Sequence, residues 1–316
     1  MSTNKKISIL GSGRVGSSIA YALTLGGKCS EIVLVDIKKE VAEGEAMDII
    51  QGTPFSHSVN IYAGDYADTA GSAVVIVTLG MARKPGQTRI ELAQANVDIV
   101  KNVMPEVVKH APNSIYLFVS NPVDVMTYAA MKVTGLPRHQ IIGSGTLLDS
   151  GRLRTIIAEE ADINPSSVHG YVLGEHGDSS VVPWSLVTIG GMGIQEYGMS
   201  AGKKEGYSKD ELLGIEKKMR ESGAKIIKGK GATNYAIAMS VNSLCDIIIR
   251  DTNSIVPISV MMTGEYGIAD VCLSIPCILG SNGLVQTLQP TLTEDEKQQL
   301  QHSAEVLKNT ISTLNF

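Results

Sequence analysis

Short apolar runs alternate with amphipathic stretches along the first 145 residues of the chain. The apolar runs cover residues 6–10, 32–35, 73–77, 115–119 and 140–142, and helical patterns cover residues 15–25, 40–50 and 91–110. Strands written as continuous apolar runs are typical of a parallel sheet that helices cover on both faces. The pattern therefore predicts an α/β domain with a doubly wound parallel sheet over residues 1–145.

The pattern changes in the second half. Apolar periodicity predicts helices over residues 146–160, 209–227 and 233–249, and acidic residues at 294–296 open a last helix, where the helix dipole favours them. Residues 168–190 have the pattern of strands around a glycine-rich turn, and residues 255–278 that of antiparallel strands. We predict an α+β second domain over residues 146–316.

A glycine-spaced turn follows the first apolar run. Gly11, Gly13 and Gly16 have the G-x-G-x-x-G spacing that serves a tight bend, close approach of a pyrophosphate, and packing of a helix on a strand. Asp36, at the end of the second run, can accept hydrogen bonds from a ribose 2′-hydroxyl and would repel a 2′-phosphate. The turn therefore predicts NAD rather than NADP, and a plain strand–helix–strand unit without a ligand is the alternative.

Other turns are expected to border the same cofactor. Ligands of doubly wound sheets lie outside the carboxyl ends of the strands, and the start of the first helix offers free N–H groups to phosphates. The further predicted cofactor contacts are Arg14, Val15, Thr78, Gly80 and Asn121.

Composition and charge narrow the classes of function. The chain has 316 residues, 43% hydrophobic and 19% charged residues, and a net charge of −5, so a basic surface for nucleic acid is not expected. No apolar run approaches the roughly 20 residues of a membrane helix. The N-terminus leads directly into the first strand, which leaves no room for a signal peptide. Four cysteines without metal-ligand spacing predict reduced thiols, no metal site and a cytoplasmic location.

Three side chains of the second half suit acid–base chemistry on a carboxylic acid. His176 lies between glycines on a turn, where its imidazole can approach a ligand and transfer protons near neutral pH. Asp149 can hold that imidazole in one tautomer, and Arg152, three residues further along one helix, can bind a carboxylate with its planar fork. The alternatives are a structural histidine and an ordinary surface ion pair.

These motifs together resemble the L-lactate/malate dehydrogenase family. The matching stretches are residues 11–16 with Asp36, 120–124, 143–149 and 174–179, in order and with matching spacing over essentially the whole chain. The resemblance implies a Rossmann domain, a mixed α/β catalytic domain, and reversible hydride transfer between NAD and an L-2-hydroxy acid. It also implies a homodimer or homotetramer.

The resemblance assigns roles to single residues. His176 resembles the acid/base of the family, Asp149 its orienting acid and Arg152 its carboxylate anchor. Asn121 resembles the residue that hydrogen-bonds the substrate oxygen. Residues 80–89 are similar to the mobile lid, from which Arg89 would polarise the substrate carbonyl, although a plain surface loop is the alternative.

Arg83 bears on which acid is the substrate. Malate-type relatives have Arg at this lid position and lactate-type relatives have Gln. Closing Arg83 over oxaloacetate would pair it with the second carboxylate, whereas an unpaired buried charge over pyruvate costs roughly 3–5 kcal/mol. Thr233 in the pocket, with Glu175 and Trp184, resembles lactate-type enzymes instead. We weight Arg83 more heavily, so the sequence predicts a malate dehydrogenase, with L-lactate dehydrogenase as the alternative.

Two further hypotheses remain open. Arg154 and His169 match positions that bind fructose 1,6-bisphosphate in allosteric bacterial lactate dehydrogenases, and an ordinary exposed Arg and His is the alternative. A catalytically silent NAD-binding module is a different class of function. Such a protein has no physical need for the combination of His176, Asp149, Arg152 and Arg89.

Overall fold

The first half of the chain alternates strands and helices, which confirms the predicted α/β class. The computed structural model describes residues 5–81, 86 and 88–316. The elements of this half are β1 Lys6–Leu10, α1 Arg14–Gly26, β2 Glu31–Val35, α2 Lys39–Gly52, β3 Asn60–Ala63, β4 Ser72–Val77, α3 Arg89–His110, β5 Ile115–Phe118, α4 Val123–Thr134 and β6 Ile141–Gly143.

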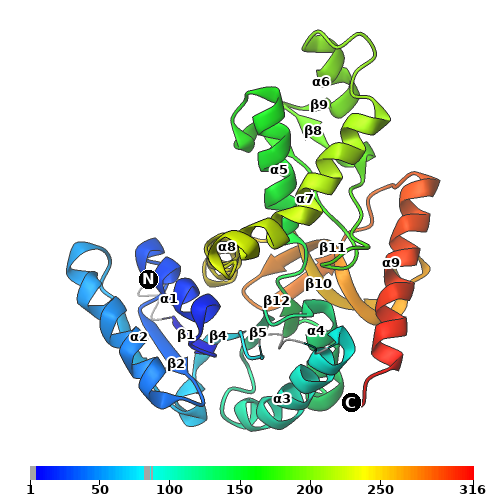
Figure 1. Cartoon of the computed structure of the whole chain (residues 1–316). Coiled ribbons are helices and arrows are strands. Elements are labelled where there is room, and N and C mark those ends of the chain that lie inside the picture. The colour runs from blue at the N-terminus through cyan, green and yellow to red at the C-terminus, as the bar shows by residue number, and fades with distance from the viewer. Residues whose placement is uncertain (1–4, 82–85, 87) are drawn as a thin grey trace.

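The second half contributes helices, a small sheet and three long strands. Its elements are α5 Leu147–Ala161, β7 Val168–His169, β8 Thr188–Ile189, β9 Met192–Gly193, α6 Ile194–Ser200, α7 Lys209–Lys230, α8 Tyr235–Arg250, β10 Ser254–Thr263, β11 Ala269–Gly280, β12 Gly283–Thr287 and α9 Glu294–Ser312. Short 3₁₀ helices lie at Thr53–Phe55, Tyr66–Thr69, Pro165–Ser167, Trp184–Leu186 and Glu265–Gly267. In Figure 1, α5, α6, α7 and the small sheet rise together above the main sheet, and α9 runs down its side.

One nine-stranded sheet joins the two halves. Its order is β12-β11-β10-β6-β5-β4-β1-β2-β3, and the six strands of the first half are all parallel. Their order, β3-β2-β1-β4-β5-β6, is that of a Rossmann fold, whose topological switch point lies between β1 and β4. Antiparallel β10 continues the sheet from β6, where Ser259 lies opposite Gly143. The carboxyl ends of β1 and β4 are therefore the expected place for a ligand.

Two apolar cores stabilise this arrangement. The larger one lies on the main sheet and includes buried residues from both halves, such as Ile9, Ile76 and Ile258. The smaller one lies between α5, α7 and the small sheet, around Leu153 and Ile215. Within residues 5–81, 86 and 88–316, no helix combines the length and the apolar character that a membrane span requires.

Some elements differ from the sequence-based prediction. Residues 170–187 form mainly turns and bridges rather than strands, because Gly170, Gly174 and Pro183 interrupt the apolar pattern. Helix α4 was not predicted from the sequence, and all its residues from Val123 to Ala130 are buried. Strand β3, at the sheet edge, has only four residues. Helix α3 begins at Arg89, because the Thr88 side chain caps it by accepting a hydrogen bond from the Glu91 N–H.

Candidate active site

The turn after β1 is so tightly packed that it requires glycine. Gly11 has φ +96°, and a Cβ at this position would lie 2.8 Å from the Thr78 Oγ1. A Cβ at Gly16 would lie 1.9 Å from the carbonyl oxygen of Gly11, so α1 packs directly on the turn. The Thr78 hydroxyl donates to the carbonyl oxygens of Leu10, at 3.0 Å, and Gly11, at 2.9 Å. The Thr78 side chain and the close backbone packing of the turn therefore hold β1, β4 and α1 together at the switch point of the sheet.

A cavity of about 600 Å³ opens over this turn. Gly11, Gly13, Asp36, Thr78 and Gly80 all line it, so the structure brings these predicted cofactor contacts together. Apart from its chain neighbours, no described residue has a heavy atom within 4 Å of the position that a Gly13 Cβ would take, so the open side of the turn can admit a phosphate.

Asp36 lies where a ribose would reach it. Its carboxylate accepts hydrogen bonds from the N–H of Ser12, at 2.7 Å, and of Lys38, at 2.9 Å. Each carboxylate oxygen has a further lone pair for a hydroxyl group. The buried Ser12 hydroxyl has no hydrogen-bond partner in the described part of the chain. This polar and open cradle fits the pyrophosphate and ribose of NAD.

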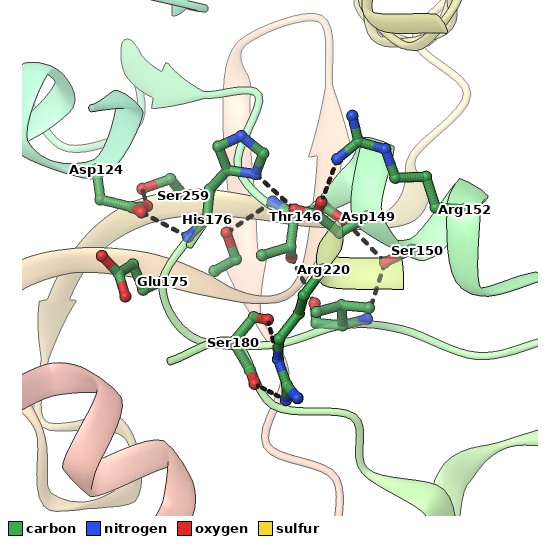
Figure 2. Close-up of polar contacts among 12 residues, drawn as sticks. Asp124, Thr146, Asp149, Ser150, Arg152, Glu175, His176, Ser180, Arg220 and Ser259 are labelled. Carbon is green, nitrogen blue, oxygen red and sulfur yellow. Dashed lines mark hydrogen bonds and ion pairs between the residues drawn. The ribbon is translucent and has the colours of Figure 1, made fainter. Parts of the chain in front are cut away.

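His176, Asp149 and Arg152 form a connected cluster (Figure 2). The His176 Nδ1 lies 2.5 Å from the Asp149 Oδ2, and the Arg152 Nη1 donates to the Asp149 Oδ1 at 2.9 Å. Asp149 lies in the first turn of α5 and Arg152 one turn later, so both face the loop that carries His176. Because a carboxylate only accepts, it holds the proton on Nδ1 and leaves Nε2 to exchange protons with a ligand.

The cluster shifts the pKa of both ionisable partners. Burial alone would lower the pKa of His176, but the charge and hydrogen bond of Asp149 outweigh it, so the pKa is raised above its ordinary value. Burial would raise the pKa of Asp149, whereas His176 and Arg152 lower it, and the net shift is downward. An ionised Asp149 beside a readily protonated His176 suits an acid–base pair.

A second, smaller cavity adjoins this cluster. Its volume is about 80 Å³, far below the roughly 300–1,000 Å³ of pockets for drug-sized ligands, so it suits a small acid. His176, Arg152, Asn121, Thr233 and Val15 line it together. The sequence-predicted acid/base, carboxylate anchor and amide therefore meet at one small space next to the cofactor turn.

Two arginines predicted for the site lie elsewhere or outside the described residues. Arg89 is 82% exposed and pairs with Asp178, whose side chain is 85% exposed, at 3.2 Å. It lines a neighbouring cavity of about 680 Å³ rather than the one at His176. Arg83 lies outside the described residues, as do residues 82, 84, 85 and 87 of the predicted lid. Arg14 is exposed at the start of α1, close to Gly231.

Arg154 and His169 line one cavity of about 460 Å³ between α5, α8 and β10. The Arg154 Nη2 donates to the carbonyl oxygen of Pro165 at 3.3 Å. The Arg154 Nε is buried, and no described residue satisfies it with a hydrogen bond. The structure thus brings the two predicted anion contacts together.

Asp124 was missed as a site residue. Its carboxylate accepts a hydrogen bond from the backbone N–H of His176 at 2.8 Å and another from the Ser259 hydroxyl at 2.6 Å. The sequence placed Asp124 only within the matched stretch 120–124, and an acid in the first turn of a helix already has a dipole explanation. The 52 residues between Asp124 and His176 leave no local signal for their contact.

Comparisons with known proteins assign both halves of the chain to one family. Residues 5–143 match the lactate/malate dehydrogenase NAD-binding domain, and residues 146–315 match the lactate/malate dehydrogenase α/β C-terminal domain.

Four similar proteins and structures are all named lactate dehydrogenases. L-lactate dehydrogenase 1 of Clostridium acetobutylicum is 45% identical over 315 residues, which is 99% of this chain and 100% of the relative. An L-lactate dehydrogenase of Clostridium perfringens is 46% identical over 97% of this chain and 96% of its own length. The minor L-lactate dehydrogenase of Enterococcus mundtii, in a ligand-bound crystal structure, superposes with a TM-score of 0.95 at 37% identity, over 99% of both chains. A lactate dehydrogenase from a deep-sea metagenome superposes at 0.94 and 39% identity, over 98% of both.

Proposed function

Because this chain belongs to the lactate/malate dehydrogenase family, we propose that it is an L-lactate dehydrogenase, which interconverts pyruvate and L-lactate. Family membership makes it an NAD-dependent oxidoreductase that acts on the CH–OH group of a small hydroxy acid. The observation that carries the reaction class is the pair of His176 and Asp149 beside Arg152 at a small cavity. The names of its relatives favour lactate over malate as the substrate.

Substrate binding starts with the carboxylate. Arg152 lines the small cavity with a side chain that is only 14% exposed, so water competes weakly for its charge. The planar fork can bind a carboxylate through two parallel hydrogen bonds. The Asn121 side chain lines the same cavity and can donate to the substrate oxygen. These contacts orient the carbonyl group toward His176.

Proton transfer follows from the geometry of the acid–base pair. Protonated His176 donates the Nε2 proton to the carbonyl oxygen, and Asp149 stabilises the imidazolium before transfer. NADH, when bound, supplies the hydride that the carbonyl carbon takes up. In the reverse direction, neutral His176 accepts the hydroxyl proton. Arg89 is proposed to polarise the carbonyl oxygen, which requires it to leave its exposed pair with Asp178.

The direction of the His176 pKa shift predicts opposite pH profiles for the two directions. Reduction needs protonated His176, so kcat/KM for pyruvate should be level at low pH and fall about tenfold per pH unit above a pKa higher than 6.5. Oxidation needs the neutral form, so kcat/KM for L-lactate should rise over the same range. Steady-state profiles in both directions test this, and a shared pKa below 6.5 would contradict it.

The prediction of malate as the substrate is not supported by the comparisons, whose relatives are named lactate dehydrogenases. Malate remains the second candidate because Arg83 can pair with the extra carboxylate of oxaloacetate. We expect kcat/KM to be at least tenfold higher for pyruvate than for oxaloacetate, and Arg83→Gln to change this ratio less than threefold. Lys84→Gln removes a neighbouring positive charge and is the matched control.

The opposite result would establish malate as the substrate. A preference for oxaloacetate that Arg83→Gln reverses, and Lys84→Gln does not, would show that Arg83 selects the dicarboxylate. The same assays with and without fructose 1,6-bisphosphate examine the proposed anion site at Arg154 and His169. Activation would support that site, because the buried Arg154 Nε and the nearby His169 can share a phosphate.

Domain division, assembly and location also stand as proposals. The division at residues 145 and 146 is supported by the separate apolar core around α5 and α7. A homodimer or homotetramer is supported by exposed apolar side chains on α1 and α8, including Tyr21, Leu25 and Met239. The four free, buried cysteines fit a reducing cytoplasmic location.

A further inference from the structure

A buried carboxylate lies behind the loop of His176. Asp124 is 2% exposed and belongs to the first turn of α4. One oxygen accepts the backbone N–H of His176 at 2.8 Å, and the other accepts the Ser259 hydroxyl of β10 at 2.6 Å. Figure 2 shows Asp124 on the opposite side of the His176 backbone from Asp149. The histidine is therefore held twice, at its ring from α5 and at its peptide from α4.

The backbone anchor matters because glycines lie on both sides of His176, although Gly174 itself is fixed by two backbone hydrogen bonds to Ser274. Gly174 and Gly177 flank Glu175 and His176, and Gly174 has φ +82°. The contact between Asp149 and Nδ1 fixes one ring atom but leaves the ring free to pivot about it. A second anchor at the peptide removes that freedom and fixes where Nε2 points. Displacements near 1 Å in a reacting group can cost about 10²-fold in rate.

We propose that Asp124 is a positioning residue for the acid–base step: it fixes the His176 peptide so that Nε2 faces the small cavity. The same turn of chain begins with Asn121, three residues earlier, which lines that cavity. Asp124 thus fixes the position of His176 relative to the side-chain amide of Asn121, which is proposed to bind the substrate. The inference rests on the proposed function of His176.

The charge of Asp124 also acts on His176. Burial raises the pKa of Asp124 to about 6, although its bonds to Ser259 and to the His176 backbone oppose that shift. Above this pH its negative charge favours protonated His176. The other charged groups that act on His176 are Asp149 and Arg152 on α5, whereas Glu175 of the same loop acts on Asp124.

Two substitutions separate the hydrogen bond from the charge. Asp124→Asn can keep both bonds, since its amide oxygen accepts from His176 and its amide group donates to Ser259. We expect its kcat to stay within about fivefold at the optimum, with the kcat/KM profile shifted to lower pH. Asp124→Ala removes both bonds, and we expect kcat and kcat/KM for pyruvate to fall together by about 30- to 100-fold with unchanged NADH affinity.

Glu296→Ala is the matched control. Glu296 is 7% exposed, and its carboxylate accepts the Ser185 N–H at 3.0 Å, the Ser185 hydroxyl at 2.6 Å and, in addition, the Thr293 N–H at 2.9 Å. We expect a comparable loss of thermal stability but a kcat within threefold of the parent. A kcat for Asp124→Ala that matches Glu296→Ala would overturn the proposal, as would an Asp124→Asn variant as slow as Asp124→Ala.

A fourth variant keeps the test open if Asp124→Ala does not fold. Asp124→Glu retains the charge and the acceptor but displaces the His176 peptide by one methylene, so kcat should fall at least tenfold. An unchanged kcat in Asp124→Glu would overturn the proposal. His176→Asn is measured alongside: if that variant stays active, the proposed function fails. If it is inactive while Asp124→Ala is normal, only the role of Asp124 fails.

Discussion

Replacement of His176 by asparagine is expected to lower kcat for pyruvate reduction about 10³-fold or more while NADH still binds. General acid–base catalysis contributes roughly 10²- to 10⁴-fold, and the asparagine amide cannot donate a proton at a matched pKa. Asparagine still fits the space beside Asp149 and can donate to it. Stopped-flow turnover and fluorescence titration of NADH measure the two quantities separately.

His110→Asn is the control for this experiment, because His110 is an exposed residue at the end of α3. We expect it to match the parent enzyme within twofold. A His176→Asn variant within tenfold of the parent would remove His176 from the mechanism. Loss of NADH binding together with turnover would instead indicate a structural role for the histidine.

The second large effect is expected for Arg152→Lys, with a fall in kcat/KM for pyruvate of about 10²- to 10³-fold. Lysine keeps the charge but loses the planar fork that binds a carboxylate bidentately. It also weakens the bond to Asp149, now 2.9 Å long and largely shielded from water. The KM for pyruvate should rise and the Kd for NADH should not change.

Arg250→Lys provides the comparison, because Arg250, whose side chain is 59% exposed, pairs with Asp246 within α8. We expect no kinetic effect from it. A normal KM in Arg152→Lys would show that the carboxylate is bound elsewhere. In that event Arg152 would serve only to orient Asp149, and the pH profile rather than the KM would change.

Much of the first half could be predicted because its information is local. Apolar runs predicted five of its strands, and the glycine spacing with Asp36 singled out residues that line one cavity at the switch point. The contacts that complete the site are not local. Asp124 meets His176 across 52 residues and Ser259 across 135, and neither contact leaves a periodic pattern.

The prediction of malate as the substrate is not supported, and here too the missing information is not local in the sequence. Only the charge of Arg83 favoured malate, whereas Thr233, Glu175 and Trp184 resemble lactate-type enzymes. A charged side chain selects a substrate only if it extends into the substrate pocket. The position of a loop side chain relative to that pocket has no signature in a single sequence. The clustering of His176, Arg152 and Asn121 around one small cavity is, by contrast, consistent with the roles expected of those residues.

The pairing of β10 with β6 has a consequence for recombination between related enzymes. The proposed boundary at residues 145 and 146 suggests an exchange of whole halves, yet it divides a single sheet in which Ser259 lies opposite Gly143. A chimera would keep its new half only if the incoming strand matched that seam, since a mismatched strand leaves unpaired N–H and C=O groups at an edge. We therefore expect the two halves to be exchangeable between related enzymes only together with the strands that pair at this seam.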